Sequence, residues 1–159
     1  MKIDGEDLMG YIRELDLVFS RMLGRFRVLF SKYNEDLITE TQFVVLRCLR
    51  NRGPSNTSYL AQTLGVTLSA VTALVNRLYR SGLVERERQD RDRRQVWISI
   101  TPKGLQLLEE VEEKRHLLLA LYFSRFPASE REKLLQMLKE IVELFERPDI
   151  VEKEFVKWE

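Results

Sequence analysis

Cysteine, histidine and long apolar runs are nearly absent from this chain of 159 residues. Because Cys48 is the only cysteine, an intramolecular disulfide and a cysteine-rich zinc site are excluded, and a reducing cytoplasm is favoured. No apolar run approaches the roughly 20 residues of a membrane span, and residues 1–15 carry acids where an export signal would be basic and then apolar. We therefore expect a soluble cytoplasmic protein with no membrane partner.

Residue patterns that support catalysis are missing as well. The chain has one histidine, no glycine-rich phosphate loop and no nucleophile-elbow pattern. We predict that the protein is not an enzyme and that it uses no metal and no cofactor.

Charge is present in both signs but is unevenly distributed. The formal net charge is only +1, which argues against attraction of the whole molecule to nucleic acid. Residues 66–104 carry 8 Lys and Arg against 4 Asp and Glu, whereas residues 105–159 carry 9 against 13. By this distribution, the middle of the chain is the part that would face DNA.

The run from Glu85 to Thr101 is the most informative stretch, because its first ten residues hold five arginines and its end alternates like a β-strand. This pattern predicts a hairpin with a charged tip, on which Arg88, Arg91 and Arg93 would bind nucleic acid. Residues 60–84 precede it and predict a short helix, a turn at Gly65 and a second helix closed by Gly82. This order is typical of a helix-turn-helix followed by a β-wing.

Residues 6–32 predict one long helix with an apolar stripe. At 1.5 Å per residue it would be about 40 Å long, which is too long for a small winged domain to cover. Some of the stripe should therefore meet another chain, and a two-fold homodimer is the commonest solution. An intramolecular helical bundle is the alternative. The stripe consists of Leu8, Tyr11, Ile12, Leu15, Phe19, Met22, Leu23, Phe26 and Phe30.

Capping residues predict where the remaining helices begin. Thr39 and Gln42 have capping-box spacing ahead of a helix that Gly53-Pro54 ends. We expect Ser58 and Thr67 to cap the two helices of the helix-turn-helix. Pro102 begins a further helix, and a second capping box is expected at Ser129 and Glu132.

These patterns predict a mainly α fold with a small β-wing. We expect an N-terminal dimerisation helix in residues 1–36, a winged helix-turn-helix DNA-binding domain in 37–101 and C-terminal dimerisation helices in 102–159, all as one integrated unit. The tail, residues 148–159, keeps enough apolar residues to pack against something.

The segments LITETQFVVLRCL (37–49) and LAQTLGVTLSAVTALVNRLYRSGLVERERQDRDRRQVWISITPKG (60–104) resemble the MarR family of bacterial transcription regulators. The most specific part is a helix ending in RSGLVER, then a wing with DRR, then ITPKG. The resemblance implies an obligate homodimer that places two winged helices on a pseudo-palindromic operator of double-stranded DNA. It also implies a repressor that a small lipophilic or phenolic effector releases.

Candidate DNA-binding residues follow from the helix face and from the resemblance. Ser69, Thr72 and Asn76 lie opposite the expected buried face and match the major-groove face of the family's recognition helix, where small polar side chains read base edges. Arg77 matches a phosphate contact. In the wing, Asp92 and Arg94 match the family's motif in which the acid orients an arginine that enters the minor groove. The two side chains can pair, because residues two apart in extended backbone point to the same side. Trp97 departs from the family pattern.

Other interpretations of these residues stay open. The helix face and the arginine run could be ordinary solvated surfaces, or the winged helix could be a protein-interaction module with an acidic or apolar face. A cleft for the effector could be lined by aromatic stripe residues, which could equally be core. His116 and Cys48 could sense pH or oxidants, or simply pack. The cleft residues would be Tyr11, Phe19, Met22, Phe26, Phe30 and Tyr33.

Overall fold

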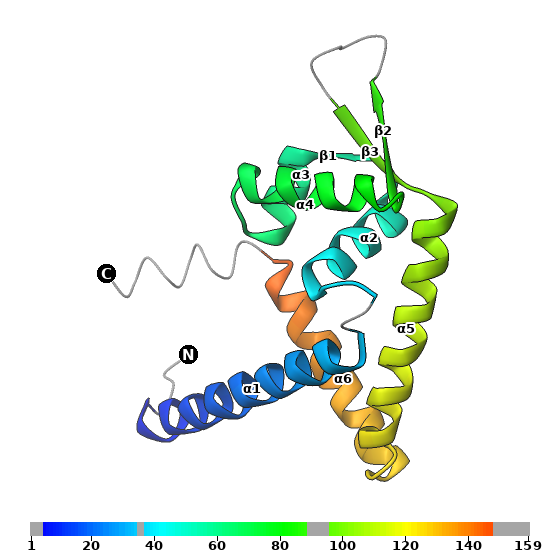
Figure 1. The fold of residues 1–159 in the computed structure, drawn as a ribbon. Helices are drawn as coiled ribbons and strands as arrows, with labels where there is room; N and C mark the ends of the chain where they lie inside the picture. Colours follow the sequence, from blue (N-terminus) through cyan, green and yellow to red (C-terminus); the bar gives the residue numbers. More distant parts are fainter. Residues whose placement is uncertain (1–4, 35–36, 89–95, 148–159) are drawn as a thin grey trace. The chain divides into compact units, whose positions relative to one another are not determined.

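The computed structural model describes residues 5–34, 37–88 and 96–147, and these divide into two compact units, residues 1–115 and 116–159. Each unit is described by itself. The first contains α1 (Gly5–Asn34), α2 (Glu40–Arg52), β1 (Ser55–Asn56), α3 (Thr57–Leu64), α4 (Leu68–Arg80), β2 (Val84–Arg88), β3 (Val96–Ile100) and the start of α5 (Pro102–Phe123) (Figure 1). The second contains the rest of α5 and α6 (Ala128–Phe145).

The three strands form one antiparallel sheet in the order β1-β3-β2. In the wing, Val84 pairs with Ile100 and Arg86 with Ile98. The very short β1 pairs Ser55 with Ile98 and Asn56 with Trp97, so β3 has a partner on both edges. This confirms the mainly helical fold with a small β-wing.

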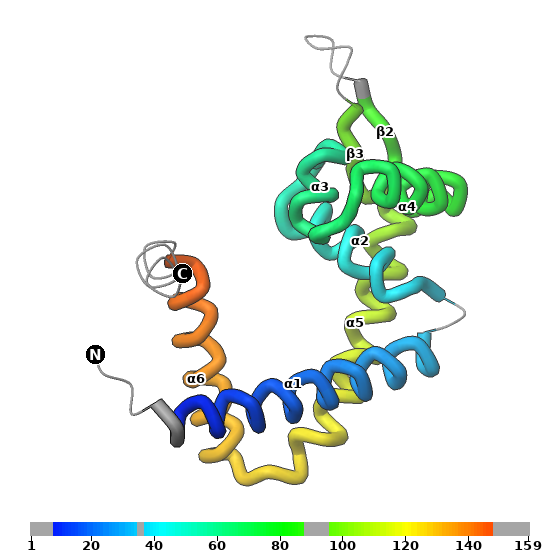
Figure 2. The backbone as a smooth tube through the Cα atoms, turned by 90° about the vertical axis from the view of Figure 1, so that its left-hand side faces the viewer, coloured from blue at the N-terminus to red at the C-terminus, as the bar shows by residue number. Residues whose placement is uncertain are grey.

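Apolar side chains from α1 to α5 converge on a single core. In Figure 2, α3 and α4 lie at the base of the β2–β3 hairpin, next to α2. Phe30 at the end of α1 lies against Phe43 of α2, with ring centroids 5.4 Å apart. Burying side chains of this size supplies the main driving force for folding. The fully buried residues include Phe30, Phe43, Leu46, Leu49, Leu60, Val71, Val75, Leu78, Ile98, Leu108 and Val111.

The predicted stripe of α1 is largely uncovered within its own unit. Seven of its nine residues are between 39% and 58% exposed, Phe26 is half-buried and only Phe30 is in the core. Helix α6, in the second unit, likewise has no buried residue. Apolar surface of this extent marks an interaction surface.

Several predicted caps are confirmed. Thr39 and Gln42 form a reciprocal capping box, with hydrogen bonds of 2.9 and 3.3 Å. Thr67 Oγ1 accepts the backbone N–H of Ala70 at 3.3 Å and caps α4. Gly65 adopts the left-handed conformation that ends α3, with φ 64°, a conformation that favours glycine.

Two predicted caps are wrong. Asn56, not Ser58, caps α3 by accepting the Tyr59 N–H at 2.8 Å. Pairing with β3 keeps Ser55–Asn56 extended, and the helix begins directly after this strand, so Ser58 already lies inside its first turn. Helix α6 begins after Pro127 with no side-chain cap, so Ser129 is likewise inside the first turn and no capping box forms.

The ITPKG motif joins the wing to α5. Thr101 Oγ1 accepts the N–H of Gly104 and donates to the carbonyl oxygen of Gly82, while Lys103 Nζ donates to the carbonyl oxygen of Ser81. A Cβ at Gly104 would overlap the carbonyl oxygen of Leu83. The motif therefore holds α5 close against the segment that follows α4.

None of the described helices is by itself long and apolar enough to cross a membrane. Only α3 and α4, taken as a bent pair, meet the length and composition criteria together.

Candidate nucleic-acid interface

The geometry of α3 and α4 is that of a helix-turn-helix. The two helices meet at 111° across the turn formed by Gly65, Val66 and Thr67. In helix-turn-helix motifs, the axes of the two helices cross at about 90–120°. In such motifs the second helix, here α4, is the one that enters the major groove.

Helix α4 has a buried and an exposed face, as predicted. Val71, Leu74, Val75 and Leu78 are at most 4% exposed and anchor the helix to the core. Ser69, Thr72, Ala73 and Arg77 are exposed, and Asn76 is half-buried. No acidic residue lies on α4, and Arg77 and Arg80 occupy its last turn. The exposed face therefore includes the small polar side chains of Ser69 and Thr72 and carries no negative charge.

Hydrogen bonds within α4 and its cap use part of the hydrogen-bonding capacity of the hydroxyl groups on this face. Thr72 Oγ1 donates to the carbonyl oxygen of Leu68 at 2.8 Å, while Ser69 Oγ lies 3.1 Å from Thr67 Oγ1. The Thr72 proton is thus used within the helix, which leaves its methyl group and its acceptor lone pairs outward. A methyl group suits contact with thymine, and an acceptor suits a base amino group.

Asn76 is held by the wing. Arg86 of β2 donates a hydrogen bond to Asn76 Oδ1, and the Arg86 guanidinium lies 5.0 Å from the centroid of the Tyr79 ring. Because arginine only donates, the amide oxygen must face Arg86 and the NH₂ group is left for another acceptor. Arg86 is not among the residues that the sequence predicts to contact DNA. Its position in the arginine run was the available signal for a role in DNA binding. The sequence does not show that Arg86 lies beside Asn76.

The wing arginines can be placed only in part. Strands β2 and β3 form the two sides of the predicted hairpin, and Arg88 is the last residue of β2. The side chain of Arg88, and all of Arg91, Asp92, Arg93 and Arg94, lie outside the described residues. Their DNA contacts stay predictions.

The other candidate residues fall into different environments. Phe30 belongs to the core, whereas Tyr11, Phe19, Met22 and Tyr33 are exposed along α1. Phe26 lies under the guanidinium of Arg115, 4.6 Å from its ring centroid.

His116 is exposed, and Cys48 is half-buried. Burial raises the pKa of the Cys48 thiol, and the nearby Arg52 charge partly opposes this. Among the described residues, no group of three or more His, Cys, Asp or Glu side chains could hold a metal ion.

A helix-turn-helix followed by an antiparallel two-stranded wing defines a winged helix-turn-helix protein. The sequence model of the MarR family matches residues 38–96, which run from just before α2 to the first residue of β3. The chain belongs to the MarR family.

Similar proteins extend the match beyond the winged domain. The HTH-type transcriptional regulator YkoM of Bacillus subtilis is 31% identical over 62% of this chain, and the chain spans 64% of YkoM. The HTH-type transcriptional repressor MdtR of the same organism is 27% identical over 92% of this chain and 97% of its own length. A MarR family structure from Bacillus stearothermophilus aligns with a TM-score of 0.76 at 27% identity, covering 91% of this chain and 99% of the other.

Proposed function

We propose that this protein is a sequence-specific DNA-binding transcriptional regulator that acts as a homodimer on a pseudo-palindromic operator. The observation that carries the proposal is the exposed face of α4, which has small polar side chains, no acidic residue and a rigid apolar anchor beneath it. Such a face lets the helix axis approach base edges. A protein-interaction module with an acidic or apolar face is less consistent with these residues.

Within this proposal, Ser69, Thr72 and Asn76 contact base edges in the major groove, and Arg77 contacts a phosphate. Arg77 is exposed and forms no ion pair within the described residues, so its charge is available to DNA. The wing places Arg94, oriented by Asp92, in the adjacent minor groove, where a narrow groove attracts arginine. Arg88, Arg91 and Arg93 add phosphate contacts.

The homodimer is supported by the uncovered apolar residues of α1 and, separately, of α6. A second copy of the chain would bury both sets, and a two-fold axis would present two copies of α4. Two recognition helices on one face of DNA must lie about 34–36 Å apart, one helical turn. This requirement links the dimer to the spacing of the operator half-sites.

Repression and release by a small lipophilic or phenolic ligand complete the proposal. The full-length similarity to a repressor, MdtR, supports repression. A ligand that binds one spacing of the recognition helices more tightly than another shifts the dimer toward that spacing. The half-buried and exposed aromatic residues of α1 are the candidates for such a cleft.

Selection of binding sites from a randomised pool of duplex DNA tests the proposal. The winning site is then titrated against salt, and the mass of the protein is measured in solution at micromolar concentration. We expect a two-fold site with half-sites about one helical turn apart and a steep loss of affinity with salt. Selection without any enriched sequence, or a single-chain mass, would contradict the DNA-reading function or the dimer respectively.

A further inference from the structure

Leu68, the first residue of α4, exposes a large apolar side chain at the start of the proposed recognition helix. It is 51% exposed, and Val66, in the turn before it, is 42% exposed. Single exposed leucines are common on protein surfaces, so the position of Leu68 in the fold decides its significance. In helix-turn-helix proteins, the N-terminal residues of the second helix are the ones that contact base edges. Leu68 therefore lies at the end of α4 where bases are read.

Thr72 lies one turn further along the same side of α4, because residues four apart are neighbours on a helix surface. Its hydroxyl donates to the carbonyl oxygen of Leu68 at 2.8 Å, which fixes the side chain and leaves its methyl group turned away from that oxygen. The Leu68 side chain and the Thr72 methyl group together form an apolar step at the start of α4. Asn76 follows one turn later in the same row.

The apolar step lies in a part of the helix-turn-helix that carries no charge. No charged residue occurs between Gly65 and Asn76. The positive side chains of α4, Arg77 and Arg80, are both in its last turn. Ionic contacts of α4 with phosphates are therefore confined to its C-terminal end. Its N-terminal end offers small polar groups and apolar surface, which suit base edges rather than phosphates.

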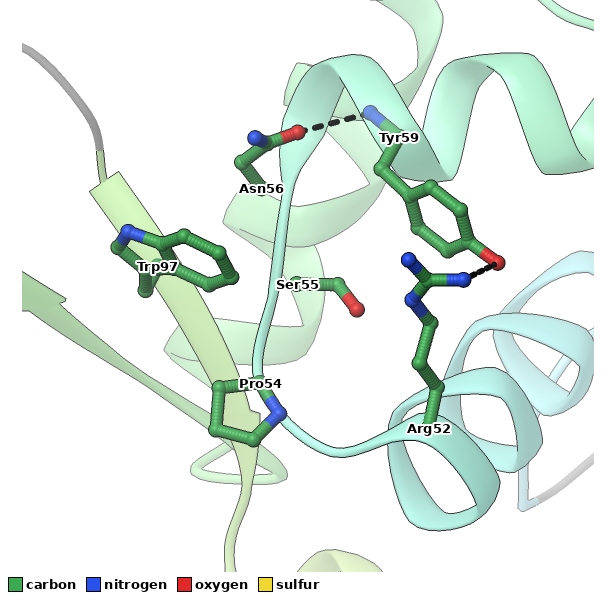
Figure 3. A pocket seen from close by; sticks show the side chains of 6 residues that line it. All are labelled: Arg52, Pro54, Ser55, Asn56, Tyr59 and Trp97. Carbon is green, nitrogen blue, oxygen red and sulfur yellow. Dashed lines mark hydrogen bonds between the residues drawn. The ribbon is translucent and has the colours of Figure 1, made fainter.

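The apolar step is presented by a backbone that is already held in place. The N–H of Val66 donates to the carbonyl oxygen of Ala61 at 3.1 Å and so fixes the turn before α4. Helix α3, which leads into this turn, is fixed at its own start. There, Asn56 accepts the N–H of Tyr59 at 2.8 Å, and Arg52 of α2 donates to Tyr59 Oη at 2.9 Å (Figure 3). A surface that is rigid before binding loses little conformational entropy when it meets DNA.

The 5-methyl group of thymine is the chemical group that such a surface recognises in the major groove. Among the four bases, thymine alone presents a methyl group there, and apolar side chains and the methyl group of threonine contact it. Removing one methyl group from water on binding raises the affinity about threefold to fivefold. A T·A pair opposite the apolar step is therefore preferred over the other base pairs.

We propose that Leu68 and the methyl group of Thr72 read the 5-methyl group of a thymine in each half-site of the operator. This inference rests on the proposed DNA-binding function and adds Leu68 to the residues that contact bases. Leu68 lies about 12 Å from Asn76 along the helix axis at 1.5 Å per residue, so the two side chains reach different base pairs. Because the contact is made to a methyl group, 5-methylcytosine at the same position is preferred over cytosine.

Deletion of single methyl groups from the DNA tests the contact directly. In the operator selected from random duplexes, each thymine of one half-site is replaced in turn by deoxyuridine, which differs from thymidine only in lacking the methyl group. We expect one position at which this replacement weakens binding about threefold to fivefold. At that position, 5-methylcytosine should bind more tightly than cytosine by the same factor, since these two bases also differ by one methyl group.

Variants of the protein assign the methyl contact to α4. Leu68→Ala should weaken binding to the thymine operator about threefold to fivefold and should no longer distinguish thymine from deoxyuridine at that position. Thr72→Ser removes one methyl group but keeps the hydroxyl that bonds to Leu68, so it should reduce the same discrimination. Leu68→Met keeps an apolar side chain and should restore it. Asn76→Ala is the matched control, because it should leave the methyl effect at this position unchanged. Circular dichroism checks that all four variants are folded.

The outcomes separate this inference from the DNA-binding function on which it rests. An enriched operator that binds equally well with deoxyuridine at every thymine position would overturn the inference and leave the DNA-binding function standing. A methyl effect that persists in full in both Leu68→Ala and Thr72→Ser, or that Asn76→Ala abolishes, would do the same. Selection without any enriched sequence would overturn both.

Discussion

Arg86 of the wing strand β2 donates a hydrogen bond to the side-chain oxygen of Asn76 on α4. This bond, together with the stacking of Arg86 on Tyr79, joins the wing to the proposed recognition helix. It also sets the orientation of the Asn76 amide, because arginine cannot accept a hydrogen bond. The residue that we expect to read a base is therefore positioned by a residue ten places further along the chain.

Asn76→Ala should relax sequence preference at one base pair of each half-site, by about 1–3 kcal/mol of discrimination. Arg86→Ala should weaken preference at the same position, because the amide is then free to rotate. The double variant should lose less discrimination between base pairs than the sum of the losses in the two single variants. Competition binding with operators altered at single positions measures all three. Strictly additive losses, or unchanged preference in Asn76→Ala, would remove this pair from base readout.

Arg77→Ala should weaken binding to all DNA sequences alike and reduce the slope of affinity against salt by about one unit. The reason is that a phosphate contact releases a counterion but carries no base information. Arg94→Ala in the wing should likewise weaken binding to every sequence. Salt titrations on operator and random DNA provide the measurement, with Arg125→Ala as a control. Wild-type affinity in either Arg77→Ala or Arg94→Ala would exclude that residue from the interface.

Gly104→Ala should destabilise the fold by at least about 1–3 kcal/mol, since the new methyl group overlaps the Leu83 carbonyl oxygen and must move backbone. Gly24→Ala is the matched control, because its methyl group would meet nothing within 4 Å in the middle of α1. There the substitution should stabilise the helix by about 0.5–1 kcal/mol. Urea unfolding measures the free energy of unfolding of both variants. Equal changes in the two variants would refute the close approach of α5 to Leu83 at Gly104.

Asn56→Ala should cost about 0.5–2 kcal/mol, because it removes the side chain that caps α3. Ser58→Ala, two residues later, should change the unfolding free energy much less, since Ser58 is exposed inside the first turn. Chemical denaturation of both variants distinguishes the two caps. A larger loss for Ser58→Ala would restore the prediction made from the sequence.

Cys48 should react slowly with iodoacetamide at neutral pH. Burial raises the pKa of its thiol, so the reactive thiolate forms only at a higher pH than in a free cysteine. Arg52→Gln should raise that pH further, because the arginine charge favours the thiolate. Alkylation rates between neutral and alkaline pH, compared with the protein in denaturant, measure the shift. Faster alkylation than in denaturant would revive an oxidant-sensing role.

Local patterns in the sequence were sufficient for much of the architecture. Apolar spacing predicts α1 and the buried face of α4, and Gly65, Thr39 and Thr67 mark helix ends correctly. These features depend on residues within one or two helical turns of each other. Short-range periodicity and capping chemistry therefore suffice to predict them.

Only the tertiary structure decided the features that depend on distant residues. Asn56 caps α3 because β1 pairs with β3 some forty residues later, and Gly104 is required because α5 returns to Leu83. The Arg86–Asn76 bond likewise joins separate elements. The sequence by itself determined the helices and the wing hairpin, but not the short strand β1. Their packing determined which side chains meet, because those contacts are made by long-range folding and leave no local pattern.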